Sequence, residues 1–475
     1  MQEKSTKKSS WQFQSGKGFV IGLGDDQLPL IENNSLSITI TYKNGKLFLD
    51  DQKVMSPTLI ITAPSDIILF NGKEYTGSLV IKREKKKVII AHQYMSEAST
   101  AEPKSIQTKP IKQAPQKVND FTVRVLIDEQ DVPSLSWTLR SEKGFVLCNP
   151  LKPSKKQTID SSEITVTACT KGFIYVNEQR LYNLQAYITP IEGAIEFNGK
   201  EYGGGFWLLA DGTSNKLINC LGIEDYVTCV LTTESWPGWS LEVNKVLAIA
   251  CRTYVISMVQ NARIMKRPYH VRNTNKHQTY GGGNGLDIHR KAVEQTHGLF
   301  LSYRSQPITA MFDGCCGGLV TKHMHGVDFK KAPYLARSYP CIYCKKFKIH
   351  SWQGKYDLHE LEKALKVALP GLRRLREIKI TKKDKAGIIQ QVQIKGAGHT
   401  YNLSGKKIYS LLNSKVKSFH FSIEKVENIV TFKGKGYGHH LGLCQWGAKE
   451  MINQGYDYKS VLEFYYPGTQ LMRLI

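Results

Sequence analysis

The sequence predicts an α+β protein in which two small β-rich modules precede a larger domain of mixed helices and sheet. Residues 1–95 contain runs of alternating apolar and polar side chains, such as 36–41, with Asn-Gly pairs at 44–45 and 71–72. Alternation of this kind is typical of half-buried strands, and Asn-Gly favours the tight turns that join them. A second β-rich region runs from about 119 to 220.

The pattern changes to helix at Ile223. Apolar residues recur at helical spacing in 226–231 and again in 243–254, and Pro237-Gly238 separates the two segments. After Arg290 the chain mixes short strands with helical stretches such as 358–367 and 458–464. These observations predict two successive helices at the start of the third structured region.

A linker and a repeated phrase define the domain organisation. Residues 96–118 are rich in Pro, Lys, Gln and Thr, which is typical of a linker. The phrase Phe-Asn-Gly-Lys-Glu-Tyr occurs at 70–75 and again at 197–202, which suggests a duplicated module. We therefore predict an accessory β module at 1–95, the linker, a second β module at 119–220 and a catalytic domain at 221–475.

Composition limits the classes of function. The 475 residues are 41% hydrophobic and 22% charged, as in globular proteins, and no apolar run approaches the ~20 residues of a membrane span. The first residues are basic without an apolar stretch behind them, so no signal peptide is visible, and either a cytoplasmic protein or numbering that starts after a leader is expected. The formal net charge of +24 indicates either attraction to a polyanion or a solvated lysine-rich surface. Of the two polyanions considered, nucleic acid is a weaker candidate than an anionic cell envelope, because no helix-turn-helix, zinc-finger framework or RNA-binding aromatic signature is present.

Glu234 is the strongest candidate for a chemical role. It lies one turn beyond Val230, on the apolar face of the first predicted helix, and Trp236 follows it closely. Burial disfavours the charged form of a carboxyl group, so its pKa should be raised. Such a group holds a proton near neutral pH and can donate it, as cleavage of a glycosidic bond requires. The competing interpretation is that Glu234 caps a helix or forms a salt bridge with Arg252.

Four ordered blocks carry a family resemblance. They are 226–234 followed by 247–254; His277-Gln278-Thr279-Tyr280-Gly281-Gly282; Cys316-Gly317-Gly318 followed by Pro333-Tyr334-Leu335; and 436–448 followed by 465–469. Together they resemble the motifs of the SpoIID (stage II sporulation protein D)/LytB family over about 250 residues. Two positions depart from the family pattern, since His440 replaces a usual glycine and Cys444 a usual serine.

The resemblance implies a lytic transglycosylase that acts on peptidoglycan in cell-wall remodelling, division or a sporulation-like process. A glutamate at the position of Glu234 would protonate the oxygen between N-acetylmuramic acid and N-acetylglucosamine. Its carboxylate would then take the proton of the muramoyl C6 hydroxyl, which closes a 1,6-anhydro ring. One carboxylate suffices when the substrate supplies the nucleophile, whereas ordinary glycosidases need two. The resemblance also implies a place in the cell envelope, on its periplasmic or extracellular side, and glycan strands stripped of their stem peptides as substrate.

The same blocks supply candidate glycan-binding residues. Arg252 could pair with the lactyl carboxylate or organise the site, and Tyr254 and Trp446 could equally be core aromatics. The full set of candidates is Arg252, Tyr254, His277, Gln278, Tyr280, His439, Gln445 and Trp446.

The cysteines suggest a structural metal site. Cys341 and Cys344 form a Cys-x-x-Cys pair, and with Cys316 upstream and His350 downstream their spacing is compatible with tetrahedral zinc. Some relatives in the family are reported to hold zinc near this block. Competing ligands are His323 and His325, and the alternatives are a disulfide or free buried thiols. Catalysis by Glu234 needs no metal, so we expect no cofactor for the reaction itself.

A second class of function remains open from the sequence. A non-catalytic peptidoglycan-binding scaffold or amidase enhancer, working with a cell-wall amidase, would keep the aromatic residues and hold Glu234 in a salt bridge. A nucleic-acid-binding protein is a distant third and rests only on the basic charge.

Overall fold

The computed structural model describes the strands between Gln2 and Gln93 without the segments that join them, and residues 121–474 except 151, 170, 211–213 and 275–276. The predicted linker at 96–118 and the Asn-Gly pairs at 44–45 and 71–72 lie outside the described residues. The chain divides into two compact units. One is Met1–Phe121 with two short pieces, Gly298–Phe300 and Met472–Ile475, and the other is Thr122–His297 with Leu301–Leu471.

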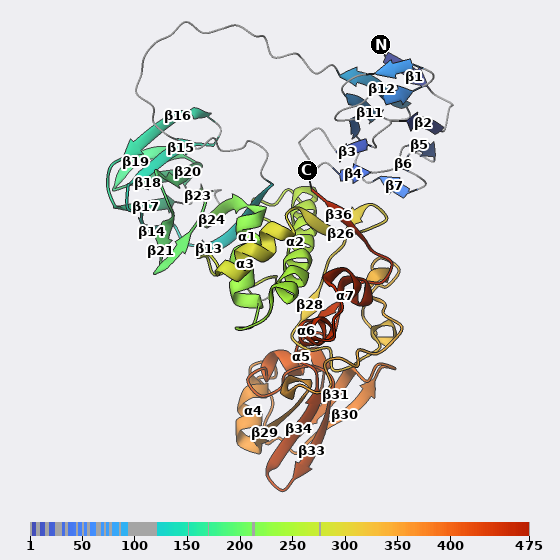
Figure 1. Cartoon of the computed structure of the whole chain (residues 1–475). Coiled ribbons are helices and arrows are strands. Elements are labelled where there is room, and N and C mark those ends of the chain that lie inside the picture. The colour runs from blue at the N-terminus through green and yellow to red at the C-terminus, as the bar shows by residue number, and fades with distance from the viewer. Residues whose placement is uncertain are drawn as a thin grey trace, which may run out of the picture. The chain divides into compact units, whose positions relative to one another are not determined.

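The first unit contains two six-stranded antiparallel sheets, of order β1-β12-β11-β8-β3-β4 and β10-β9-β2-β5-β6-β7 (Figure 1). Both sheets contribute buried apolar side chains, such as Ile61 from one sheet and Phe13 from the other. The strands are β1 (Gln2–Ser5), β2 (Ser10–Gln14), β3 (Phe19–Leu23), β4 (Ile31–Asn33), β5 (Ser37–Lys43), β6 (Lys46–Leu49), β7 (Gln52–Val54), β8 (Thr58–Thr62), β9 (Ile68–Phe70), β10 (Lys73–Tyr75), β11 (Ser78–Glu84) and β12 (Lys87–Gln93).

The second β module belongs to the second unit and also has two sheets. Their orders are β16-β15-β20-β23-β24-β13-β25 and β19-β18-β17-β14-β21-β22. The strands are β13 (Thr122–Gln130), β14 (Ser134–Arg140), β15 (Phe145–Asn149), β16 (Lys152–Ile159), β17 (Glu163–Cys169), β18 (Phe173–Val176), β19 (Gln179–Asn183), β20 (Gln185–Pro190), β21 (Ile195–Phe197), β22 (Lys200–Tyr202), β23 (Gly205–Ala210), β24 (Asn215–Gly222) and the short β25 (Val271–Arg272).

The two β modules share one topology. Adding 12 to the number of each strand in the first module gives the strand at the same place in the second module, so that β1 corresponds to β13 and β2 to β14. Among the described strands, β25 is the one addition. The register is kept too: Ser10 pairs with Thr41 and Ser136 with Thr167, with the side-chain hydroxyls 3.3 and 2.7 Å apart. The repeated phrase lies in two equivalent hairpins, β9–β10 and β21–β22. The topology thus supports the duplication that the hexapeptide suggested.

Three helices follow the second β module directly. They are α1 (Ile223–Glu234), α2 (Leu241–Ile264) and α3 (Asp287–Gln295), and they pack against one another (Figure 1). As predicted, a break at Pro237-Gly238 separates α1 from α2, because proline lacks a backbone N–H and Gly238 adopts a φ of 76°. The apolar face of α1 is buried as its periodicity predicts, and Glu234 is the last residue of the helix.

The remaining elements form small sheets and short helices. The sheets are β27-β26-β36, the parallel pair β28-β35, β29-β34-β33 and β30-β31-β32. The last two sheets, together with α4 and α5, enclose one hydrophobic core, whose residues come from the segment 352–432. Elements here are β26 (Leu299–Tyr303), β27 (Gln306–Pro307), β28 (Phe312–Asp313), η1 (Thr321–His323), η2 (Pro333–Leu335), η3 (Lys348–His350), β29 (Ser351–Asp357), α4 (Leu358–Lys366), β30 (Glu377–Lys383), β31 (Ile389–Lys395), β32 (Thr400–Leu403), α5 (Gly405–Leu411), β33 (Phe421–Val426), β34 (Ile429–Lys435), β35 (Leu443–Cys444), α6 (Gln445–Asn453), α7 (Tyr458–Tyr465) and β36 (Gln470–Arg473).

The α+β fold class is therefore confirmed. The helices predicted at 358–367 and 458–464 correspond to α4 and α7. None of the helices in the described part of the chain combines the length and the apolar character that a membrane crossing needs.

Candidate active site

Glu234 is held at the C-terminal end of α1 by a backbone donor from a distant segment. The Thr279 N–H donates a hydrogen bond to Glu234 Oε1 at 2.9 Å, and the Thr233 hydroxyl donates to the Thr279 carbonyl. Burial raises the pKa of Glu234 above its usual value, and the hydrogen bonds from Thr279 act in the opposite direction. Among the described residues, no lysine, arginine or histidine forms an ion pair with this carboxyl group. Burial without a cation suits a group that must carry a proton.

The segment that carries Thr279 is fixed on both sides by buried polar contacts. The Tyr226 hydroxyl donates to Gln278 Oε1 at 3.1 Å, and Gln278 Nε2 donates to the Cys251 carbonyl at 3.3 Å. The Tyr280 hydroxyl donates to Asn219 Oδ1 at 2.6 Å. Gln278 and Tyr280 are buried, so in this structure they position Thr279 and do not present a surface to a glycan.

Tyr254 and His277 form a separate pair that remains partly exposed. The Tyr254 hydroxyl oxygen and His277 Nδ1 are 3.3 Å apart, and the two rings meet edge to face. Both are able to offer a hydrogen bond to a sugar hydroxyl, and their role in glycan binding stays a prediction.

The C-terminal signature reaches Glu234 through α6. Gln445 is buried, and its Nε2 donates to the backbone carbonyl of Glu234 at 3.1 Å. The next residue, Trp446, meets the rings of Trp236 and Trp239 edge to face, each at 5.5 Å between centroids. Trp236, two residues after Glu234 in the sequence, is 44% exposed and so leaves part of a large aromatic ring open to solvent.

Two residues of this site were not proposed from the sequence. Thr279 acts through its backbone N–H, which no side-chain pattern reveals. Trp236 was noticed only as an apolar neighbour of Glu234, although a tryptophan exposed beside a candidate acid is the usual stacking surface for a sugar ring.

Comparison with known protein sequences places this chain in a family. Residues 211–303 match the profile of the Stage II sporulation protein (SpoIID) family, and residues 342–442 match a domain of unknown function, DUF8618. An uncharacterized protein of Brachyspira hyodysenteriae is 31% identical over 357 residues, which cover 74% of this chain and 94% of that protein. The stage II sporulation protein D of Bacillus subtilis is 26% identical over 273 residues, covering 54% and 77% of the two chains. An amidase enhancer of the same organism is 28% identical over 291 residues, covering 51% of this chain and 39% of the enhancer.

The chain belongs to the SpoIID family.

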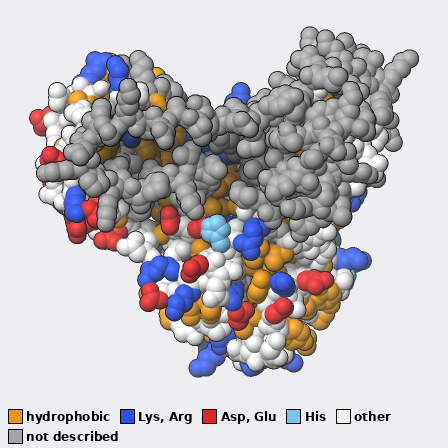
Figure 2. Space-filling model, turned by 45° about the horizontal axis from the view of Figure 1, so that its top comes forward, with side chains coloured by type: hydrophobic (Ala, Val, Ile, Leu, Met, Phe, Trp, Pro, Cys, Tyr) orange, Lys and Arg blue, Asp and Glu red, His pale blue; other side chains and the backbone are white. Residues whose placement is uncertain are grey.

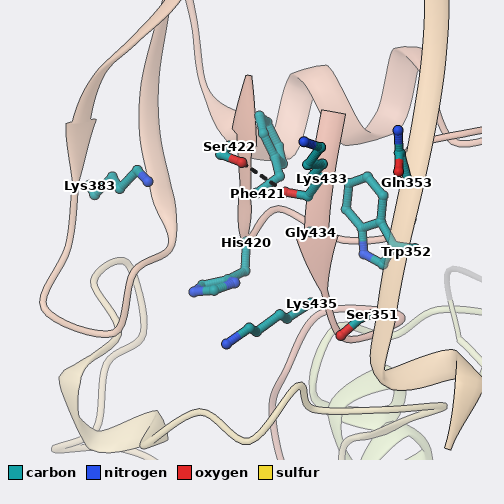
Figure 3. Close-up of a pocket in the computed structure, with 10 residues that line it drawn as sticks. All are labelled: Ser351, Trp352, Gln353, Lys383, His420, Phe421, Ser422, Lys433, Gly434 and Lys435. Carbon is teal, nitrogen blue, oxygen red and sulfur yellow. Dashed lines mark hydrogen bonds between the residues drawn. The ribbon is translucent and has the colours of Figure 1, made fainter. Parts of the chain in front are cut away.

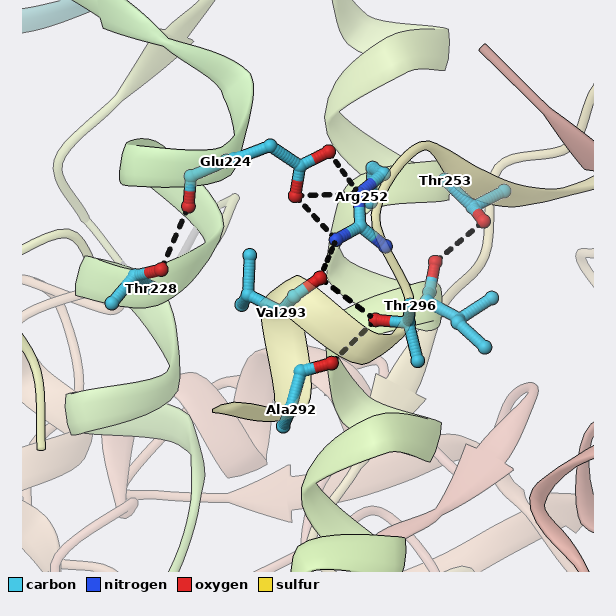
Figure 4. A network of polar contacts seen from close by, with 8 residues as sticks. Glu224, Thr228, Arg252, Thr253, Ala292, Val293 and Thr296 are labelled. Atoms are coloured by element: carbon cyan, nitrogen blue, oxygen red, sulfur yellow. Dashed lines mark hydrogen bonds and ion pairs between the residues drawn. The ribbon is translucent and has the colours of Figure 1, made fainter. Parts of the chain in front are cut away.

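Arg252, for which the sequence offered pairing with a substrate carboxylate or a role in organising the site, lies inside the group of helices. Its side chain has no exposed surface, and its Nε donates to Glu224 Oε1 at 3.0 Å (Figure 4). Its Nη2 also lies 3.5 Å from the Val293 carbonyl of α3. The guanidinium group therefore joins α1, α2 and α3.

The SpoIID signature loop explains why glycine is usual at position 440. His440 adopts a φ of 69°, in the left-handed region that favours glycine. Its ring is buried, with Nδ1 3.0 Å from the Cys316 carbonyl oxygen, and its backbone N–H donates to Asp313 Oδ2. The neighbouring His439 accepts a hydrogen bond on Nδ1 from the Leu441 N–H at 3.1 Å. These contacts hold the loop, and none of them joins His439 to Glu234.

Three of the four predicted metal ligands come together, with a different fourth member. The Sγ atoms of Cys316, Cys341, Cys344 and Cys444 all lie within 4.8 Å of one another. Cys444 takes the place predicted for His350, whose Nδ1 instead lies 3.0 Å from the Ser351 hydroxyl. The reason is the parallel pairing of β28 with β35, which aligns Asp313 with Cys444 and brings position 444 beside Cys316. This pairing joins segments more than a hundred residues apart, so local spacing could not reveal it.

A pocket of about 610 Å³ lies over β29, β33 and β34 (Figure 3). It is lined by Ser351, Trp352, Gln353, Lys383, His420, Phe421, Ser422, Lys433, Gly434 and Lys435. None of the predicted site residues lines it. The three lysines make it suited to an anionic group.

The visible surface mixes charges of both signs. On the face drawn in Figure 2, lysine and arginine side chains alternate with aspartate and glutamate over the described part of the chain. The described residues visible on this face thus form no single basic stripe.

Proposed function

We propose that this SpoIID-family protein is a peptidoglycan lytic transglycosylase with Glu234 as its acid. The observation that carries the proposal is the environment of Glu234: a partly buried carboxyl group, raised in pKa by burial, held by a backbone donor and free of any cationic partner among the described residues. The salt bridge with Arg252, one of the two structural interpretations of Glu234, is not found among the described residues, because Arg252 pairs with Glu224 at the other end of α1.

The proposed reaction uses one carboxyl group twice. Protonated Glu234 gives its proton to the oxygen that links N-acetylmuramic acid to N-acetylglucosamine, and the bond from C1 to that oxygen breaks. The C6 hydroxyl of the muramoyl residue attacks C1, and the Glu234 carboxylate accepts its proton. The products are a free N-acetylglucosamine end and a 1,6-anhydro end, and Glu234 regains the proton that it started with.

The contacts around Glu234 supply positioning. The Thr279 N–H fixes one carboxyl oxygen, and Gln445 fixes the backbone that carries the side chain. The exposed ring of Trp236 offers a stacking face for a sugar, with Tyr254 and His277 as further hydrogen-bonding groups. No cofactor takes part in these steps.

The family supports a cell-wall role for the chain on the outer side of the membrane. A second function, as an enhancer of a cell-wall amidase, is favoured by the similarity to the Bacillus subtilis amidase enhancer. Product analysis distinguishes the transglycosylase from the enhancer, because an enhancer alone leaves glycan strands intact.

The test is mass spectrometry of glycan strands, with stem peptides present and removed, after incubation with the full chain. We expect 1,6-anhydro-muramoyl ends, on the peptide-stripped strands above all. Binding to strands that stay uncut would contradict the enzyme and leave the enhancer role, to be measured as faster hydrolysis by an added amidase.

The pH dependence of cleavage should report the raised pKa of Glu234. Because the acid must carry a proton, activity is retained below its folded pKa and lost as pH rises through that value. Burial raises this pKa above the ordinary 4.5, so kcat/KM should begin to fall at a pH higher than that of an ordinary glutamate. The measurement is a pH-rate profile, with glycan binding followed over the same range as a control. A fall centred at or below pH 4.5 would contradict the assignment.

Trp236→Ala should weaken glycan binding more than it affects stability. The ring is 44% exposed, and a lost stacking contact of about 0.5–1.5 kcal/mol raises KM by roughly two- to twelvefold. Tyr456→Ala is a matched control, since Tyr456 is 43% exposed and lies beyond the C-terminal end of α6. Steady-state kinetics on soluble glycan measures both variants. An equal rise in KM for the two would argue against a stacking role for Trp236.

A further inference from the structure

The four-cysteine cluster has the dimensions of a metal site. A tetrahedral zinc ion with Zn–S bonds of about 2.3 Å places its sulfur atoms about 3.8 Å apart. The Sγ atoms of Cys316 and Cys344 are 4.0 Å apart, and all four Sγ atoms lie within 4.8 Å of one another. A disulfide would need about 2.05 Å, and all four are free thiols. The group is buried, and it supplies four protein ligands, as a closed structural site requires.

The surroundings of the cluster are those of anionic sulfur. The backbone N–H groups of Cys316 and Gly447 point at Cys444 Sγ, at 3.3 and 3.4 Å. Cys444 is also the N-cap of α6, where the helix dipole favours negative charge. Outer donors of this kind stabilise metal-bound thiolates.

A buried arginine provides matching positive charge. Arg337 is 1% exposed, and its Nη2 lies 3.8 Å from Cys316 Sγ. In the described part of the chain no ion pair joins Arg337 to a carboxylate, and its Nε and Nη1 have no hydrogen-bond partner. A buried cation needs a compensating anion. Zinc bound by four thiolates carries a net charge of −2, which meets this need, whereas four neutral thiols do not.

The space around the sulfurs is kept open by a glycine. A Cβ atom on Gly447 would lie 2.9 Å from Cys341 Sγ, 3.2 Å from Cys444 Sγ and 2.1 Å from the Tyr465 hydroxyl. Any side chain at this position would displace the ligands, so the fold reserves room at the cluster.

We propose that Cys316, Cys341, Cys344 and Cys444 bind one Zn²⁺ ion and that this ion fixes the start of α6 beside Glu234. Cys444 precedes Gln445, whose amide donates to the Glu234 carbonyl. Phe347, three residues after Cys344, packs on Trp446 with ring centroids 4.7 Å apart. The ion therefore joins three distant segments at the point where the C-terminal signature meets α1. The link to Glu234 rests on the proposed function, whereas the metal site does not.

The first test is the metal content of the full chain purified without added metal. We expect about one zinc per chain by elemental analysis, and after exchange with Co²⁺ the intense sulfur-to-cobalt charge-transfer absorption of a tetrahedral thiolate site. Wild-type protein with no bound metal and four reactive thiols, or with a disulfide inside the cluster, would overturn the proposal.

The decisive variant is Cys444→Ser. Serine keeps the N-cap of α6, as the usual family residue at this position, and removes one sulfur ligand. We expect a loss of zinc affinity of at least tenfold and the disappearance of the cobalt charge-transfer band. Cys341→Ser should behave in the same way. Retention of one zinc per chain with unchanged affinity in both variants would refute the ligand set.

Two further cysteines serve as controls. Cys315 is buried beside the cluster but outside it, and Cys148 lies in the second β module. Cys315→Ser and Cys148→Ser should both retain one zinc per chain; equal metal loss in them would show that the effect is not specific to the four ligands. Metal binding and glycan cleavage are measured separately. Zinc-loaded protein that never cleaves glycan would refute the proposed function and leave the metal site intact.

Discussion

Glu234→Gln should lower the rate of glycan cleavage by about 10²–10⁴-fold while glycan binding stays within twofold of the wild type. Glutamine has the same size and keeps an oxygen that can accept the Thr279 N–H, which is 2.9 Å from Oε1 in the wild type. It has no acidic proton to give to the glycosidic oxygen. The measurement is the yield of 1,6-anhydro ends over time, beside a binding curve for the same strands.

Glu242→Gln is the matched control for this prediction. Glu242 lies in the first turn of α2, where its side chain is 42% exposed and pairs with Lys245. The same change of charge there should leave cleavage within about twofold of the wild type. Equal cleavage by the Glu234→Gln and Glu242→Gln variants would exclude Glu234 as the acid.

Glu234→Asp separates the position of the carboxyl group from its chemistry. Aspartate can still donate a proton, but its carboxyl group is withdrawn by one methylene from the Thr279 donor and from the substrate. A displacement of about 1 Å can cost about 10²-fold in rate. We expect cleavage between that of the wild type and that of Glu234→Gln, with the products unchanged.

The helices and Glu234 could be predicted because they depend on local pattern. The apolar spacing of 226–231 determines which face of α1 is buried, and that face carries the carboxyl group at its last residue. The Phe-Asn-Gly-Lys-Glu-Tyr repeat likewise marks equivalent strand pairs, because Lys73 pairs with Phe70 as Lys200 does with Phe197. The full correspondence of the two modules exceeds what one hexapeptide could show, because it consists of strand order and register over both sheets.

The parts that could not be predicted depend on pairing between distant segments. The Thr279 donor is a backbone group, and it lies 45 residues after Glu234. Cys444 joins the cysteine cluster only because β28 and β35 pair in parallel, whereas His350 has the more regular spacing after Cys344. The role of Arg252 could not be predicted for the same reason, because it depends on Glu224 in the first turn of α1, which faces Arg252 across the helix pair. The sequence left open a substrate carboxylate or a role in organising the site, and in the structure Arg252 pairs with a carboxylate of the protein itself.

Arg252→Ala should therefore be a stability variant. The guanidinium group is fully buried and the Glu224 side chain is 22% exposed, so the change leaves a largely buried carboxylate without the cation that neutralises it. Removal of one partner of a buried ion pair costs about 3–5 kcal/mol in the free energy of unfolding. For a unit of this size that corresponds to a fall in Tm on the order of 10 °C. Thermal unfolding followed by circular dichroism measures it.

Arg290→Ala is the control for charge removal on the same group of helices. Arg290 lies on α3, is 51% exposed and pairs with Asp287 within the first turn of that helix. Exposed pairs contribute about 0–1 kcal/mol, so the melting temperature should change by no more than about 3 °C. A similar loss in both variants would show that the Arg252 pair is no more important than a surface pair.

The double variant Glu224→Gln/Arg252→Met separates the charge pair from simple packing. It removes both charges and keeps the length of the buried side chain, so it should recover much of the stability that Arg252→Ala loses. If Arg252 instead served a substrate carboxylate, the double variant would regain stability and still bind glycan at least tenfold more weakly. We expect glycan affinity within twofold of the wild type, because in this structure the guanidinium group contacts α1 and α3 and has no exposed surface.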